Sequence, residues 1–231
     1  GETLKTIYIG GGTPSSLSLE ELKQLFQILD HLKKDKNIEY TIECNIESIT
    51  KEKLELFLKA GINRISIGIQ TVDEFSIQKL NRHHTKETVL NTIQLVKEVG
   101  FSNINVDFMY AFPWQTKEMF LNDLQFFLSL DVPHISTYSL ILEEHTVLGN
   151  ENVTPLDEDI EVWMYQTIKE QLSKLGYKHY EVSNFAKPNY ESKHNLVYWN
   201  NESYYGFGVG ASGYVQRIRY ENTRSLPKYE S

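Results

Sequence analysis

The sequence lacks several residue types and patterns, and each absence excludes a class of protein. Its one cysteine, Cys44, excludes an internal disulfide and any cysteine-rich metal site built from these residues alone. No apolar run approaches the roughly 18 residues of a membrane span, and no signal-peptide pattern opens the chain. Basic residues are in deficit, 23 against 31 acidic ones, so the net charge of −8 argues against a nucleic-acid-binding surface. A reducing, cytoplasmic setting fits these absences.

The composition is that of an ordinary globular protein. Hydrophobic residues make up 40% of the chain and charged residues 23%, which argues against disorder. A length of 231 residues is enough for one large domain, and α/β barrels commonly reach this size.

The first 142 residues alternate short strand patterns with amphipathic helices. Strands are expected at Leu4–Ile9, Ile38–Cys44, Arg64–Gln70, Ile104–Met109 and His134–Leu140. Helices are expected from Ser18 (with Glu21 completing a capping box), and over Thr50–Ala60, Asp73–Leu80, Thr85–Val99 and Thr116–Leu130. Such alternation implies a parallel sheet with right-handed crossovers. The fold class is therefore α/β, and an incomplete TIM-like (β/α) barrel suits the pattern better than a doubly wound sheet.

Residues 143–231 have a different character and are expected to form an α+β extension of the barrel formed by residues 1–142. Glu143–Asp159 is predicted to pass over the barrel mouth, followed by a helix at Glu161–Leu175 and a strand at Tyr177–Val182. Ser183–Tyr205 has little periodicity and is predicted to be a functional loop segment, and Tyr214–Tyr220 a further strand.

Three successive glycines, Gly10–Gly12, follow the apolar run Ile7–Ile9 and precede Thr13 and Pro14. Glycine is costly in a regular element, so this run indicates a loop where the backbone comes close to a ligand.

Polar side chains recur at the predicted ends of later strands, where the active sites of (β/α) barrels lie. They are Glu43 with Asn45, Gln70 and Asp107, and Arg82 follows on the connection after the third strand. Carboxylates, an amide and a guanidinium around one opening suit a zwitterionic ligand that bears hydroxyls. The alternative is that these side chains only solvate the rim of the sheet.

Five motifs in order resemble those of radical S-adenosylmethionine (radical SAM) proteins, in the branch of oxygen-independent coproporphyrinogen III oxidase. They are Tyr8–Ser15, Glu43–Asn45, Ser66–Thr71, Asn81–His84 and Asn105–Asp107. The resemblance implies that S-adenosylmethionine contacts Gly11, Gly12, Thr13, Glu43, Gln70, Arg82 and Asp107, and that Ile141 lies near its adenine.

A second set of motifs is similar to the HemW-type heme chaperones of that branch: Glu181–Ala186, His194–Trp199 and Tyr204–Gly208. The resemblance implies a protein that binds heme and passes it to respiratory hemoproteins at the membrane. His194 is then a candidate axial ligand, beside Tyr198 and Trp199 as rings that can stack on a porphyrin.

Two alternatives to this interpretation stay open. His194 and Asn195 can instead bond loop backbone while the two aromatic rings anchor the loop. The other function that the resemblance allows is that of an oxygen-independent coproporphyrinogen III oxidase, which oxidatively decarboxylates its substrate to protoporphyrinogen IX in porphyrin biosynthesis. A departure from the chaperones lies at Ala211–Gly213, where relatives often carry a histidine.

The [4Fe–4S] cluster of radical SAM proteins requires a Cys-x-x-x-Cys-x-x-Cys segment that this sequence does not contain. Because that segment precedes the glycine motif in the family, we expect the sequence to begin after it. The remaining candidates are weaker. His83–His84 is expected at an exposed polar rim, nothing near His145 completes a metal site, and Cys44 is expected to be a small buried residue.

Overall fold

The computed structural model describes residues 3–140 and 154–230, and it divides into two compact units, Gly1–Glu191 and Ser192–Ser231. Sequence reasoning placed a change of character after residue 142, whereas the boundary between the compact units follows Glu191. The domain boundary expected at residue 142, between the barrel and its extension, stays a prediction. Ile141 and His145 lie outside the described residues.

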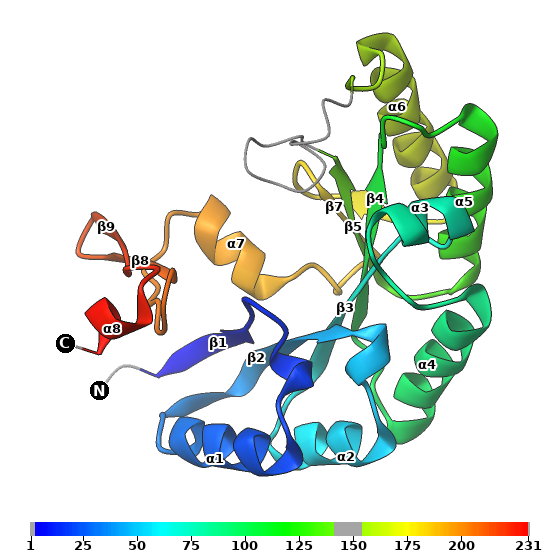
Figure 1. Cartoon of the computed structure of the whole chain (residues 1–231). Coiled ribbons are helices and arrows are strands. Elements are labelled where there is room, and N and C mark those ends of the chain that lie inside the picture. The colour runs from blue at the N-terminus through cyan, green and yellow to red at the C-terminus, as the bar shows by residue number, and fades with distance from the viewer. Residues whose placement is uncertain (1–2, 141–153, 231) are drawn as a thin grey trace. The chain divides into compact units, whose positions relative to one another are not determined.

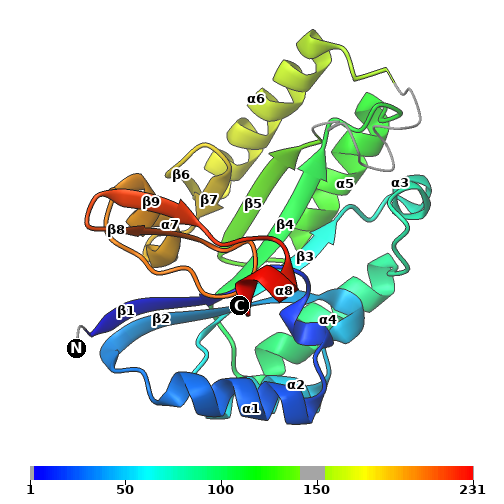
Figure 2. The same cartoon turned by 60° about the vertical axis from the view of Figure 1, so that its left-hand side comes forward.

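The first unit is built on a curled, mostly parallel sheet of seven strands in the order β1-β2-β3-β4-β5-β7-β6 (Figures 1 and 2). The strands are β1 (Leu4–Ile9), β2 (Lys34–Asn45), β3 (Arg64–Gln70), β4 (Ile104–Tyr110), β5 (His134–Ser139), β6 (Lys178–His179) and β7 (Asn184–Ala186). Neighbours from β1 to β5 pair in parallel, and β7 pairs antiparallel with both β5 and β6. The incomplete barrel is confirmed.

Helices lie along the outer side of this sheet (Figure 1). They are α1 (Leu19–Asp30), α2 (Lys51–Lys59), α3 (Glu74–Lys79), α4 (Lys86–Val99), α5 (Lys117–Ser129) and α6 (Glu158–Lys174), with short turns η1 (Pro14–Ser16) and η2 (Ile46–Ser48). Each of the first helices starts where the sequence indicates. Ser18 and Glu21 form the expected capping box, and Thr50 accepts a hydrogen bond from the Lys53 amide. Gly61, in the left-handed region at φ +87°, follows the end of α2.

Alternation along each strand separates an apolar face from a polar one. On β3, Ile65, Ile67 and Ile69 are buried in the hydrophobic core beneath the helices. Successive side chains point to opposite faces, so Arg64–Gln70 presents its polar members and Gly68 on the inner face. The same alternation on β4 buries Val106 and Phe108 in that core and turns Asp107 inward.

Two predictions for the last third of the first unit were wrong in extent. The strand expected over Tyr177–Val182 covers only Lys178–His179, and Asn184–Ala186, expected in a loop, forms β7 against β5. A three-residue strand is stabilised by pairing with a distant partner, and local periodicity does not report that pairing.

The second unit contains α7 (Lys193–Trp199), β8 (Ser212–Val215), β9 (Ile218–Glu221) and α8 (Leu226–Tyr229). The loop expected there was wrong, because Ser192 caps α7 and accepts a hydrogen bond from the Asn195 amide. The single strand expected at Tyr214–Tyr220 was also wrong. The chain reverses at Gln216 and Arg217, both at positive φ, and β8 pairs antiparallel with β9.

A buried carboxylate on α5 holds the end of β3. The Thr71 hydroxyl donates to Asp123 Oδ2 at 2.5 Å, and the Val72 amide donates to Oδ1 at 2.9 Å. Burial raises the pKa of Asp123 to about 6 although both hydrogen bonds act to lower it. Asp123 therefore ties the strand end that carries Gln70 to the helix layer.

We expect Asp123→Ala to lower the free energy of unfolding by about 2–4 kcal/mol, because it leaves two buried donors without an acceptor. Asp123→Asn keeps one acceptor and should cost less than half as much. Urea denaturation at pH 7 measures both values, with Glu118→Gln on the exposed side of α5 as the control. Equal losses in the alanine and asparagine variants would contradict this role for the acceptor.

Candidate functional site

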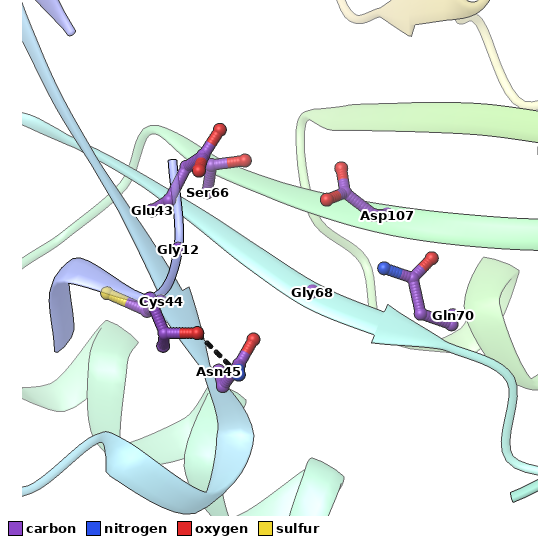
Figure 3. Close-up of a pocket in the computed structure, with 9 residues that line it drawn as sticks. Gly12, Glu43, Cys44, Asn45, Ser66, Gly68, Gln70 and Asp107 are labelled. Carbon is purple, nitrogen blue, oxygen red and sulfur yellow. Dashed lines mark hydrogen bonds between the residues drawn. The ribbon is translucent and has the colours of Figure 1, made fainter. Parts of the chain in front are cut away.

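A pocket of about 180 Å³ lies where the first four strands end (Figure 3). It is lined by residues of the glycine loop and of β2, β3 and β4: Gly12, Thr13, Glu43, Cys44, Asn45, Ser66, Gly68, Gln70 and Asp107. Parallel pairing brings these carboxyl-terminal ends to one edge of the sheet, which is why positions far apart in the sequence share one cavity.

The glycine loop is shaped by close approach and by backbone conformation. A Cβ at Gly10 would lie 2.7 Å from the Tyr8 ring and 3.0 Å from the Glu43 carboxyl group. Gly11 and Gly12 have φ values of +75° and +51°, which side chains other than glycine rarely adopt. The first glycine thus makes room for Glu43, and the next two allow the turn that bounds the pocket.

Glu43 is held from two sides. The Tyr8 hydroxyl donates to Oε1 at 2.6 Å, and the Gly11 amide donates to Oε2 at 3.1 Å. Burial and the Glu43 carboxylate raise the pKa of Tyr8, so the phenol keeps the proton that it donates. This arrangement fixes the orientation of the Glu43 carboxyl group.

The loop is also tied to the end of β2. Asn45 Nδ2 donates to Thr13 Oγ1 at 3.2 Å (the dashed line in Figure 3), and the Asn45 amide donates to Ser15 Oγ at 3.1 Å. Lys53 of α2 donates to the Ser15 carbonyl at 2.6 Å. These contacts fix Thr13 against the strand that carries Glu43.

Gln70 lines the pocket at the end of β3, and Arg82 contacts the backbone of that strand. Gln70 has a φ of +72°, and its buried Oε1 has no hydrogen-bond partner among the described residues. Arg82 reaches back from the segment after α3 and donates from Nη2 to the Gly68 carbonyl at 2.7 Å. Buried polar atoms are normally paired, so the free Gln70 oxygen, which faces the pocket, is available to accept a hydrogen bond from a ligand.

Asp107 on β4 provides the second carboxylate. Asn105 Nδ2 donates to its Oδ1 at 2.9 Å. Burial raises the pKa of Asp107 to about 6, helped by the nearby Glu43 charge and opposed by the bond from Asn105. Two carboxylates and a free amide oxygen together can accept from an ammonium group and from hydroxyls, while exposed loop N–H groups can donate to a ligand.

The structure places the predicted site residues as follows. Gly12, Thr13, Glu43, Gln70 and Asp107 line one pocket, Gly11 contacts Glu43, and Arg82 contacts the backbone of Gly68. Ile141 lies outside the described residues. His194 belongs to the second unit, where its Nε2 pairs with the Tyr198 hydroxyl at 2.7 Å on α7.

The histidine pair was only partly predicted correctly. His83 is exposed, as expected for a rim residue, but His84 is buried, with Nε2 2.8 Å from the Thr71 carbonyl and Nδ1 3.5 Å from Glu47. Cys44 is buried beside the pocket as expected, and burial raises the pKa of its thiol to about 12.

Sequence reasoning missed Tyr8, Ser66 and Gly68 as individual members of the site. Period-two alternation was the available signal, because Ser66 and Gly68 share the face of Gln70. Tyr8 carried no comparable signal, since its contact with Glu43 depends on the pairing of β1 with β2.

Comparison with known proteins agrees with the family that the sequence motifs resemble. The radical SAM superfamily pattern matches residues 2–127, more than half of the chain. The chain belongs to the radical SAM superfamily. It is 45% identical to the heme chaperone HemW of Lactococcus lactis over 99% of this chain and 62% of that protein, and 40% identical to HemW of Bacillus subtilis over 98% and 61%.

The fold has a close counterpart among solved structures. Coproporphyrinogen III oxidase (HemN) from Escherichia coli, a radical SAM enzyme, superposes with a TM-score of 0.86 over 98% of this chain and 56% of that one, at 20% identity. At this identity the likeness shows the fold alone. The chain spans about three fifths of the length of the curated relatives it matches.

The cofactors of the superfamily fit these residues unequally. A [4Fe–4S] cluster needs three thiolates, whereas this sequence offers only the buried Cys44. Among residues 3–140 and 154–230, no three His, Cys, Asp or Glu side chains gather as a metal site. The pocket fits S-adenosylmethionine better, because Glu43, Asp107 and the free Gln70 oxygen are acceptors for its ammonium and ribose hydroxyls.

We expect Asp107→Asn to stabilise the ligand-free protein at pH 7.5. The folded pKa of about 6 lies above the ordinary 3.8, so the contribution of Asp107 to stability is present at low pH and is lost as the pH rises through 6. The asparagine variant should therefore gain less stability than the wild type when the pH falls from 7.5 to 5. Urea denaturation at both values checks this, and identical gains would contradict it.

Proposed function

We propose that the pocket binds S-adenosylmethionine and that the protein is a heme chaperone that delivers heme to hemoproteins. The chaperone part is carried by the 45% identity to a HemW protein across 99% of this chain. The proposal that the pocket binds S-adenosylmethionine is supported by superfamily membership and by the hydrogen-bond acceptors that line the pocket.

In the pocket, each group has a distinct task. Glu43, fixed by Tyr8 and Gly11, would accept from the ammonium of the methionyl part, beside the Gly11–Thr13 backbone. Asp107 and the free Gln70 oxygen would accept from hydroxyls of the ribose. Arg82, held at the Gly68 carbonyl, would face the ligand carboxylate. Ile141 stays the proposed neighbour of the adenine.

S-adenosylmethionine bound next to a reduced [4Fe–4S] cluster supplies a carbon radical, which is the chemistry of the superfamily. The residues of this chain do not hold that cluster, since the three cysteines are absent. What they do is bind and orient the ligand, with a half-buried, hydrogen-bonded carboxylate at each side.

The second unit supplies the proposed heme site. His194 is partly exposed on α7 with Tyr198, and their rings pack edge to face at 5.0 Å between centroids. Trp199 is 56% exposed and Phe207 is 78% exposed. An imidazole beside exposed rings has the chemistry to ligate iron and to cover a porphyrin face, so we propose His194 as an axial ligand.

Within the described residues no helix is long and apolar enough to cross a membrane. A cytoplasmic protein that hands heme to respiratory hemoproteins at the membrane is the cellular role that we propose. The HemW relatives are named heme chaperones, which supports the handling of heme in this proposal.

Binding of S-adenosylmethionine can be tested by calorimetry. We expect Glu43→Gln and Asp107→Ala each to weaken binding by about 10- to 100-fold, because each removes a charged acceptor. Glu55→Gln on the exposed side of α2 is the matched control and should bind like the wild type. Unchanged affinity in both pocket variants would place the ligand elsewhere.

The heme role is tested by titrating the full-length, cluster-reconstituted protein with heme, beside an assay for coproporphyrinogen III decarboxylation. We expect tight binding without turnover, and a Soret band that shifts in His194→Ala but not in His31→Ala, which alters an exposed histidine at the end of α1. Decarboxylation would identify the protein as the oxidase instead. An unchanged Soret band in His194→Ala would remove that residue as the ligand.

A further inference from the structure

A buried chain of polar side chains runs beneath the pocket across three strands. Asn105 of β4 is its centre, with Nδ2 2.9 Å from Asp107 Oδ1 and 2.9 Å from Ser66 Oγ. On its other side, Oδ1 lies 2.6 Å from His134 Nδ1 and 3.0 Å from Ser136 Oγ, both on β5. His134 Nε2 in turn lies 2.7 Å from the Tyr180 hydroxyl.

The register of the sheet brings the side chains of this hydrogen-bond network together. Asn105 pairs with Ser66 on one side and with His134 on the other, and Asp107 pairs with Ser136. Directly paired residues of neighbouring strands present their side chains on the same face. The hydrogen-bond network therefore results from strand pairing, and it lies on the inner face of the sheet that also forms the pocket.

The donor and acceptor roles along this hydrogen-bond network follow from the charge of Asp107. An ionised carboxylate only accepts, so the Asn105 amide must turn its NH2 toward Asp107 and its oxygen toward His134. Burial and the Arg64 charge hold the pKa of His134 well below its usual range, so the imidazole is neutral and has one N–H. That proton must be on Nδ1 to reach Asn105, which leaves Nε2 to accept from Tyr180.

We propose that His134, which lies outside the pocket, is a positioning residue that orients Asp107 through Asn105. This inference rests on the proposed function of the pocket and deepens it. With its oxygen engaged by His134 and Ser136, Asn105 cannot turn over without setting that oxygen against Asp107. Asn105 thus donates to Oδ1 of Asp107 in a fixed direction, with Ser136 also bonded to that carboxylate, and this sets how Asp107 faces a ligand hydroxyl.

Tyr180 acts on the orientation of Asp107 from still further away, through His134. Its hydroxyl donates to Nε2 and thereby selects the Nδ1–H tautomer, while its ring packs edge to face on the imidazole at 5.6 Å between centroids. The tyrosine follows β6, so the orientation of a pocket carboxylate depends on a residue that is 73 positions further along the sequence than Asp107 (180 − 107).

Other charged or titratable groups also act on this network. Asp107 is influenced by Glu43 of β2 and Arg64 of β3, and it acts in turn on Tyr8 of β1 and Tyr138 of β5. None of these groups hydrogen-bonds to Asn105 in the described residues. Variants at His134 therefore change the orientation of Asn105 while leaving the charges around Asp107 in place.

The first experiment uses the ligand-free protein. Nitrogen-15 NMR of the histidine rings should show His134 neutral with its proton on Nδ1 at pH 7. Carbon-13 NMR of the Asp107 carboxyl should show its titration midpoint rising by about one pH unit in His134→Phe, since the aligned donor is lost. His134→Asn retains an N–H donor near the Nδ1 position, so the Asp107 midpoint in this variant should return most of the way to the wild-type value.

The second experiment measures S-adenosylmethionine affinity against pH in the same proteins. We expect about 10-fold weaker binding in His134→Phe at pH 7, recovery to within about threefold in His134→Asn, and no change in the exposed control His31→Asn. The pH at which binding weakens should move with the Asp107 midpoint. Tyr180→Phe, which keeps the ring packing, gives the same readouts should His134→Phe fail to fold.

The outcomes separate the two proposals. If the wild type binds no S-adenosylmethionine but the Asp107 midpoint moves as expected, the proposed function fails and the positioning role stands. If the wild type binds it and neither the midpoint nor the affinity responds to the His134 and Tyr180 variants, the positioning role fails. A proton on Nε2 of His134 would overturn it directly.

Discussion

Holding two half-buried carboxylates at the edge of one sheet is the constraint on which the site depends. Glu43 and Asp107 each lose part of their contact with water, and the cost of that loss must be offset by hydrogen bonds. Glu43 is compensated by the Tyr8 hydroxyl and the Gly11 amide, and Asp107 by the amide of Asn105. The raised pKa of Asp107 shows that its compensation is incomplete. A cationic or hydroxylated ligand would complete it, so the same imbalance that costs stability favours binding.

This constraint also explains the local sequence around each carboxylate. A loop that must bring an amide to Glu43 needs backbone at close range, and a Cβ at Gly10 would meet that carboxyl group. The helix layer meanwhile buries the other side of the central strands β2 to β5, so on β3 an apolar residue such as Ile67 alternates with Ser66 and Gly68. Stability therefore comes from one face of the sheet, and the other face is left to polar chemistry.

Local signals were enough to predict the first five strands and the helices between them. Capping residues such as Ser18 and glycines such as Gly61 determine these boundaries within a few positions, and the described structure has them there. The last third was predicted less well because its elements are short and paired over long distances. Nothing near Asn184 indicates pairing with β5, and the β8–β9 turn uses Gln216 and Arg217 in place of the glycine or asparagine that would mark it.

The site residues, like the secondary structure, could be predicted only where a local signal in the sequence marks them. Strand ends can be read locally, so Glu43, Gln70 and Asp107 emerge from the sequence, and the structure brings them to one pocket. Residues that act through another side chain emerge only once the register is known. Asn105 entered the sequence analysis only as the start of the Asn105–Asp107 motif, and His134 only as the start of a strand. Strand pairing sets the two side by side and leaves one consistent direction for their hydrogen bonds. Because an ionised Asp107 imposes that direction, the orientation of Asn105 and the tautomer of His134 follow from the charge on a single pocket residue.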